Sequence, residues 1–296
     1  MKSTLSQQKQ GIILALATFI MWGVFPIYFK LLSNVNPVTI LANRIIWSFV
    51  LLFILLIGLR RLHNIRRLLH LKKVTAWLLL SGSLISCNWG IFIYAVEQGQ
   101  ILETSLGYFI NPFFSILLGA LVLGEKLSTI AKIATFIVLI AIGIQIYAMR
   151  GLPFIAIILP LTFALYGLIR KKITIPPLEG LFIETALITP LAIAFLIYTN
   201  ISITAINIEQ NTLLLLILSG AVTVFPLLTF IAATHRLPLS TIGFMQYISP
   251  SISLLVAVFL YHEHLDTYKL ISFILIWLSL LMTTITSLRN KNHKTP

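Results

Sequence analysis

The segment 108–112, Tyr-Phe-Ile-Asn-Pro, leads through an apolar run to Glu-Lys-Leu at 125–127. The same pattern returns later, where Gln-Tyr-Ile-Ser-Pro at 246–250 leads to Glu-His-Leu at 263–265. In both copies the proline precedes the glutamate by 13 residues. Recurrence of a motif at a fixed internal spacing indicates a chain built from repeated units.

Other segments match at nearly the same offset, which drifts between 136 and 144 residues. Thr-Phe-x-x-Trp-Gly at 18–23 corresponds to Thr-Phe-x-x-Tyr-Gly at 162–167. Small loop insertions explain the drift. We therefore divide the chain into two halves, 11–149 and 152–288.

The composition places both halves in a membrane. Hydrophobic residues make up 58% of the 296 residues and charged residues only 10%, too few to cover the surface of a soluble domain. A helix needs about 20 apolar residues to cross the bilayer. The apolar runs predict spans at 11–32, 37–59, 74–95, 102–123, 129–149, 152–169, 177–199, 211–232, 239–260 and 269–288. These runs are too long for barrel strands, so the predicted fold is an all-α integral membrane protein of ten helices.

Each half then holds five helices. An odd number of crossings makes the second half enter the membrane from the opposite side, which predicts an inverted repeat. Inverted repeats recur in secondary transporters, where substrate sites lie near the membrane midplane between the repeats. Because they also occur in channels, the architecture predicts transport and favours a carrier over a channel.

Lys and Arg predict the orientation. The side that carries both termini holds 17 of the 21 basic residues, Arg170 among them, and the opposite side holds Lys30, Arg150 and Lys269. Arg44 falls inside a span. Positive charge concentrates in cytoplasmic loops, so both termini are predicted to be cytoplasmic. This placement makes the net charge of +13 a membrane feature and argues against nucleic acid as a partner.

Two ionisable residues lie well inside predicted spans. Arg44 follows Pro37 by seven residues, and Glu184 follows Pro177 by seven. Both are therefore about 10 Å deep at 1.5 Å per residue, from opposite faces. Charge at that depth is costly and usually functional. Arg44 is a candidate to bind an anionic substrate group, or it extends toward the nearer surface. Glu184 is a candidate for proton coupling.

Further polar and aromatic residues inside the spans are candidates to line a substrate cavity. Pro112 and Pro250 each free a backbone carbonyl four residues earlier, and freed backbone at membrane depth is tolerated where it is buried or lines a cavity. The full set of candidate substrate-binding residues is Trp22, Arg44, Asn88, Tyr108, Asn111, Tyr166, Glu184, Gln246 and Tyr247. Helix packing is the alternative for each of them.

No catalytic, cofactor or metal site is predicted. The chain has one cysteine, Cys87, and no Gly-rich phosphate loop, nucleophile elbow or zinc signature. The expected partners are the lipid bilayer and a small-molecule substrate. A membrane-embedded enzyme would need a catalytic cluster, and a sensor would normally need a soluble domain, so both remain the less favoured alternatives.

The motifs at 105–112, 123–127 and 237–250, with Trp22-Gly23 and Asn88-Trp89, resemble those of the RarD family in the EamA branch of the drug/metabolite transporter superfamily. The resemblance spans about 11–288. It implies a ten-helix bacterial inner-membrane permease with a cavity between two EamA repeats, exporting a metabolite or drug. The residue before the arginine of this family is usually histidine, whereas this chain has Asn43. A proton carrier at that position is therefore not implied here.

Overall fold

The computed structural model describes residues 5–97, 101–150, 154–198, 210–262 and 265–292, and most of these residues are helical. No strand occurs within these residues. The helices are α1 (Leu5–Gly23), α2 (Phe25–Lys30), α3 (Pro37–Gly58), α4 (Leu62–His70), α5 (Lys72–Glu97), α6 (Ile101–Val122), α7 (Thr129–Ala148), α8 (Phe154–Lys172), α9 (Pro177–Tyr198), α10 (Gln210–Thr234), α11 (Leu239–Gln246), α12 (Ile248–Leu255), the π-helix η1 (Val256–Leu260) and α13 (Thr267–Asn292).

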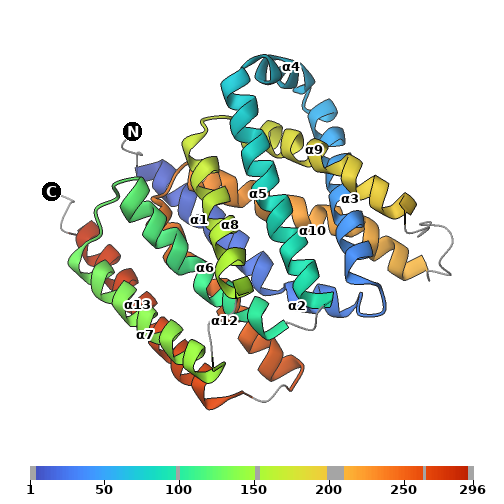
Figure 1. Cartoon of the computed structure of the whole chain (residues 1–296). Coiled ribbons are helices and arrows are strands. Elements are labelled where there is room, and N and C mark those ends of the chain that lie inside the picture. Colours follow the sequence, from blue (N-terminus) through green and yellow to red (C-terminus); the bar gives the residue numbers. More distant parts are fainter. Residues whose placement is uncertain (1–4, 98–100, 151–153, 199–209, 263–264, 293–296) are drawn as a thin grey trace.

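Ten segments among the described residues are long and apolar enough to cross a bilayer. Eight are single helices, one joins α1 to α2, and one joins α11, α12 and η1. The short helix α4 links α3 to α5 outside the spans (Figure 1). The predicted all-α membrane fold with ten spans is confirmed. Helices suit this setting because lipid offers no partner for backbone polar groups.

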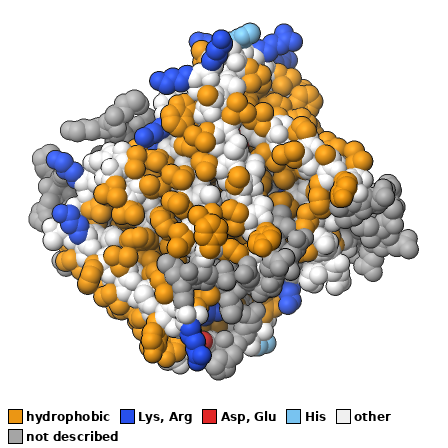
Figure 2. All heavy atoms as spheres, in the orientation of Figure 1, with side chains coloured by type: hydrophobic (Ala, Val, Ile, Leu, Met, Phe, Trp, Pro, Cys, Tyr) orange, Lys and Arg blue, Asp and Glu red, His pale blue; other side chains and the backbone are white. Residues whose placement is uncertain are grey.

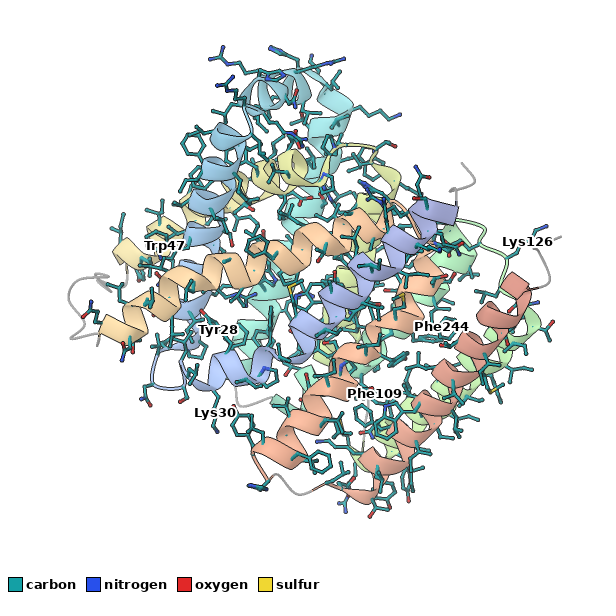
Figure 3. The ribbon with its side chains drawn as sticks, turned by 180° about the vertical axis from the view of Figure 1, so that it is seen from behind. Tyr28, Lys30, Trp47, Phe109, Lys126 and Phe244 are labelled. Carbon is teal, nitrogen blue, oxygen red and sulfur yellow. The ribbon has the colours of Figure 1, made fainter. Side chains whose placement is uncertain are left out.

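The bundle has two distinguishable ends. α1 begins and α13 ends at the same end, which we call the terminal end (Figure 1). Gly11 of α1 lies there against Arg236 and Leu237, between α10 and α11. We call the opposite end, which carries α2, the distal end. In Figure 3, Tyr28 and Lys30 on α2 lie far across the molecule from Lys126, which follows α6.

Contacts between the halves repeat in inverted form. α1 packs on α10, and its counterpart α8 packs on α5. The matched threonines take part in both contacts. Thr18 donates to Thr229 (2.7 Å), and Thr162 accepts from Asn88 (3.0 Å). The last helices of the two halves, α7 and α13, pair with each other at the edge of the bundle (Figure 1).

Two spans are broken, and each break has a proline just after it. α1 ends at Gly23, three residues before Pro26, and Ser253 donates to the carbonyl of Gly23 (3.0 Å). α11 ends at Gln246, four residues before Pro250. Proline lacks an N–H and clashes with the carbonyl four residues earlier, which explains both positions. Pro112, the repeat counterpart of Pro250, instead stays inside the continuous helix α6.

The outer surface fits a bilayer. Figure 2 shows apolar side chains across most of this face, with Lys and Arg gathered at its margins. Large apolar residues such as Phe136, Leu191 and Phe259 are exposed on the outside of the helices. A soluble monomer rarely exposes so extensive an apolar surface. Lipid contact accounts for this distribution.

Candidate functional site

Arg44 lies on α3 in the distal half of the bundle, where its guanidinium is held from two directions. Its Nε donates to the hydroxyl of Thr223 on α10 (3.0 Å), and that hydroxyl donates to the carbonyl of Ser219 (2.8 Å). Its Cζ lies 5.2 Å from the ring centroid of Phe29 and 5.8 Å from that of Trp89. Such distances give cation–π attraction. Among the described residues, nothing hydrogen-bonds to Nη1 or Nη2 of Arg44.

Glu184 is part of a sealed polar cluster in the terminal half. Its Oε1 lies 3.3 Å from Nη1 of Arg170, and the two side chains are 1% and 0% exposed. Ser81 donates to the same oxygen, and the Tyr166 hydroxyl lies 3.4 Å from Oε2. Arg44 and Glu184, which occupy matched repeat positions, therefore have different partners. Within the described part of the chain no ion pair joins them.

The position of Arg170 differs from its prediction as one of the basic residues in the loops at the terminal end. It does lie near that end, in the last turn of α8, but it is buried. Gly180 on α9 makes room for it, since a Cβ there would lie 2.6 Å from Nη2 of Arg170. Nothing in the run Arg-Lys-Lys at 170–172 signals that one cation turns inward. Ser81, Thr223 and Phe29 likewise have no sequence signal that would have identified them.

The matched residues Trp22 and Tyr166 are brought together by the inverted packing. Trp22 contacts Phe163 and Phe230, each at 5.6 Å between ring centroids. Tyr166 stacks on Phe230 at 6.5 Å and 13°. Tyr166 is fully buried and Trp22 is partly buried. Both rings pack on other aromatic rings here, and stacking on a substrate stays a prediction.

Two asparagines on the spans have backbone partners. The Asn88 amide donates to the carbonyl of Leu159 (2.7 Å) and to Thr162 (3.0 Å), so it joins α5 to α8. Asn43 donates to the carbonyl of Thr39 one turn earlier (3.0 Å), and its Oδ1 is buried without a partner among the described residues. In this arrangement Asn88 stabilises the contact between the halves.

Tyr108 and Asn111 lie on α6. Tyr108 is 47% exposed, packs its ring 6.0 Å from Phe92, and lies near Arg44. Within the described residues its hydroxyl has no hydrogen-bond partner. Asn111 has a buried Oδ1 that also lacks one. Of the predicted site residues, Tyr108 is the one that the structure brings near Arg44.

Gln246 and Tyr247 lie at the break between α11 and α12, where α11 packs on α6. Both are buried, and their Oε1 and hydroxyl lack partners in the described part of the chain. The ring of Tyr247 packs edge-on against Phe109 (6.2 Å), and Figure 3 shows Phe109 facing α12 and α13. Unpaired polar atoms beside a helix break are typical of positions that rearrange or bind water. The predicted substrate-binding residues therefore lie at several separate positions in the bundle.

At the terminal end, Glu125 joins the two halves. Its carboxylate accepts from the backbone N–H of Leu239 (2.6 Å) and Ser240 (2.8 Å) and from the Ser240 hydroxyl (2.6 Å). It therefore caps α11, where a negative charge is favourable. Lys171 of α8 lies 3.9 Å from Glu125 and donates to the carbonyls of Thr234 and Leu237.

Two shallow hollows open on the sides of the bundle and contain none of the predicted site residues. One lies between α1, α3, α9 and α10 and includes Leu14 and Leu228. The other lies between α3 and α9 and includes Phe49 and Pro190. Their apolar lining suits lipid chains. No group of three or more His, Cys, Asp or Glu that could hold a metal occurs among the described residues.

Ten spans in two inverted halves define a membrane transporter. One half contains the buried Arg170–Glu184 ion pair, and the other contains Arg44, whose Nη1 and Nη2 have no hydrogen-bond partner among the described residues. The chain belongs to the EamA-like transporter family, whose profile matches residues 9–147 and again 151–285.

Two relatives agree with this assignment, and a solved structure shares the fold. The chain is 42% identical over 284 residues to an uncharacterised transporter of Vibrio cholerae, covering 95% of this chain and 94% of the relative. It is 40% identical over 277 residues to the protein RarD of Escherichia coli, covering 93% of each. A structure titled "Crystal structure of protein" shares the fold, with a TM-score of 0.73 at 14% identity over 95% of this chain and 98% of that one. The resemblance to the RarD family is confirmed.

Proposed function

We propose that the protein is a secondary-active exporter of a small organic solute, which works by alternating access between its two halves. We place it in a bacterial inner membrane with both termini in the cytoplasm. The excess of Lys and Arg at the terminal end supports this orientation, since positive charge concentrates on cytoplasmic loops. In this proposal the terminal end faces the cytoplasm and the distal end faces outward.

The proposal rests on a difference in packing between two matched interfaces, that of α10 with α3 and that of α5 with α9. At Gly220 on α10, an added Cβ would lie 2.6 Å from the carbonyl oxygen of Trp47 on α3. At Gly82 on α5, the repeat counterpart, the nearest atom would be Cα of Glu184 on α9, at 3.5 Å. The two halves are similar in sequence, but their helices approach each other more closely at one of these equivalent interfaces than at the other. Exchanging the two packings between the halves would expose the centre of the bundle to alternate sides.

The distribution of ion pairs supports closure at the terminal end. The three ion pairs among the described residues, formed by Glu125, Glu179 and Glu184, all lie in the terminal half. The distal half instead contains Tyr108, whose side chain is partly exposed, and Arg44, whose Nη1 and Nη2 have no hydrogen-bond partner in the described part of the chain. This arrangement matches a carrier that is closed toward the cytoplasm and accessible from the other side.

Counterflow in liposomes tests the proposal. Purified protein is reconstituted into vesicles loaded with an unlabelled solute, and uptake of the labelled solute is measured across a panel of organic acids, amino acids and aromatic drugs. A carrier exchanges solute, so internal solute should accelerate uptake, and a pH gradient should change the rate if protons are coupled. The variant Arg44→Ala should reach the membrane and lose exchange. Arg66→Ala, on exposed α4, is the matched control.

Two results would contradict this function. Flux that internal solute does not accelerate would indicate a channel. Absence of flux for every solute tested would favour the two alternative functions, a membrane-embedded enzyme or a sensor.

A further inference from the structure

Arg44 differs from Arg170, the other arginine within the spans, because the two terminal nitrogens of its guanidinium, Nη1 and Nη2, are available to a ligand. Nε and Nη2 of Arg170 are sealed inside the protein without partners, whereas no nitrogen of Arg44 is in that condition. The Arg44 side chain is only partly buried. A guanidinium presents its donors as a planar fork that matches a carboxylate with two parallel hydrogen bonds. An unpaired fork at membrane depth therefore has the geometry of an anion site.

Thr223 determines which edge of the fork is free. Its hydroxyl proton is donated to the carbonyl of Ser219, so its oxygen can act as the acceptor for Nε of Arg44. This bond occupies the side edge of the guanidinium and leaves the Nη1–Nη2 edge. A carboxylate would have to approach this end edge. Thr223 thus orients Arg44 without contacting the ligand.

Aromatic rings surround the same guanidinium. Phe29 lies on one helix and Trp89 on another, at 5.2 and 5.8 Å from Cζ of Arg44. Phe92, one turn after Trp89, holds the ring of Tyr108. Together they provide apolar ring surface beside a single cation, and Tyr108 adds a hydroxyl with no partner among the described residues. The geometry favours an anion that carries a flat apolar body.

The charge at the site favours one negative charge on the ligand. Lys30, a cation on neighbouring α2, lies over the ring of Tyr261 (5.4 Å). Figure 3 shows Lys30 at the end of α2, beyond Tyr28. The Tyr28 hydroxyl proton is also occupied, because it is donated to the carbonyl of Leu215. A phosphate dianion would call for a second cation, whereas a monocarboxylate is matched by one guanidinium.

We propose that the end edge of the Arg44 guanidinium is the carboxylate anchor of the substrate site, and that the transported solute is a monocarboxylate with a flat apolar or aromatic body. This inference rests on the proposed function and names its substrate class. Arg44 and Tyr108 contact the ligand, Phe29 and Trp89 pack beside it, and Thr223 is a positioning residue.

Ligand-induced stabilisation of the purified full-length protein in detergent tests the anchor without any transport. A ligand that binds the folded state raises the melting temperature, by an amount that grows with its concentration relative to its Kd. 3-Phenylpropionate should raise it increasingly with concentration, and the isosteric 3-phenylpropionamide, which lacks the charge, should bind at least about tenfold more weakly. Inorganic phosphate at equal concentration should give no shift.

Variants separate the anchor from a structural effect. Arg44→Ala should weaken binding of 3-phenylpropionate about 10- to 100-fold and abolish its preference over the amide. Arg44→Lys keeps the charge without the fork and should lie between. Thr223→Val should weaken binding about threefold to tenfold, and Thr223→Ser, which keeps the acceptor, should restore it. Arg66→Ala should bind as the unaltered protein does.

The outcomes distinguish this inference from the proposed function. Equal shifts with acid and amide, a shift with phosphate, or unchanged acid binding in Arg44→Ala would overturn the anchor, while counterflow of other solutes would leave the carrier standing. Selective acid binding without flux of any solute would support the anchor and overturn the carrier.

Discussion

The Nη1 atom of Arg170 lies 3.3 Å from Oε1 of Glu184, and neither side chain is open to solvent. The two residues come from adjacent spans, α8 and α9, and lie 14 positions apart in the chain. Each charge has been removed from water, so its burial is tolerated because the other is present. The pair also leaves Arg44, the repeat counterpart of Glu184, without an acidic partner in the described part of the chain.

Removing one member of this pair should be more harmful than removing both. We expect Arg170→Leu and Glu184→Leu each to lower the free energy of unfolding by about 3–5 kcal/mol, because each leaves an uncompensated buried charge. The double variant should cost less than the sum of the two. Unfolding titrations in mixed detergent micelles give the three values. Additive losses would show that the two charges do not stabilise each other.

Gly180 should behave as part of the same cluster although it carries no side chain. An added Cβ would contact both terminal nitrogens of Arg170, so Gly180→Ala should displace the guanidinium and destabilise the protein by about 1–3 kcal/mol. Gly90→Ala on α5 is the matched control, since nothing lies within 4 Å of its added Cβ. The prediction fails if both substitutions have the same effect on the melting temperature.

Glu125 should stabilise the start of α11. Glu125→Gln removes the charge and one acceptor from a group that receives three hydrogen bonds, which should cost about 1–3 kcal/mol. Asp266→Asn is the control, because Asp266 also caps a helix start, through Tyr268 and Lys269, and asparagine caps as well as aspartate. Thermal unfolding of both variants is the measurement. Equal small losses would mean that the Glu125 carboxylate contributes no more than an ordinary cap.

His235 should make stability depend on pH. Burial lowers the pKa of His235 below its ordinary value of 6.5, and the nearby charges of Arg170, Arg236 and Lys171 lower it further, against the hydrogen bond to the Arg170 carbonyl. The folded protein therefore binds fewer protons than the unfolded chain in mildly acidic solution. The contribution of neutral His235 to stability should be fully present above pH 6.5. It should decrease as pH falls through 6.5 toward the pKa of His235 in the folded protein.

Melting temperatures between pH 8 and pH 5 check this expectation. His235→Gln cannot titrate but can still donate to the Arg170 carbonyl, so its profile should be flatter over the same range. His70→Gln, on exposed α4, should keep the slope of the unaltered protein. A slope unchanged by His235→Gln would assign the pH dependence to other groups.

The spans and the repeat could be predicted because they depend on local sequence. Apolar length decides whether a helix can cross the membrane, and Pro112 and Pro250 mark equivalent positions whatever the packing. The consequences of those prolines were not predictable in the same way. α6 continues through Pro112 while the ninth span breaks before Pro250.

The amino-acid sequence alone determined that this protein is a ten-span membrane protein in two inverted halves, since hydrophobic length and an odd number of helices per half require it. Only the tertiary structure decided which charges meet. Arg170 turns inward where Gly180 on another helix leaves space. Thr223 on another helix accepts from Nε of Arg44, whose Nη1 and Nη2 have no hydrogen-bond partner among the described residues. Such partners lie on different helices, so their pairing is decided by helix packing and leaves no signal in the local sequence.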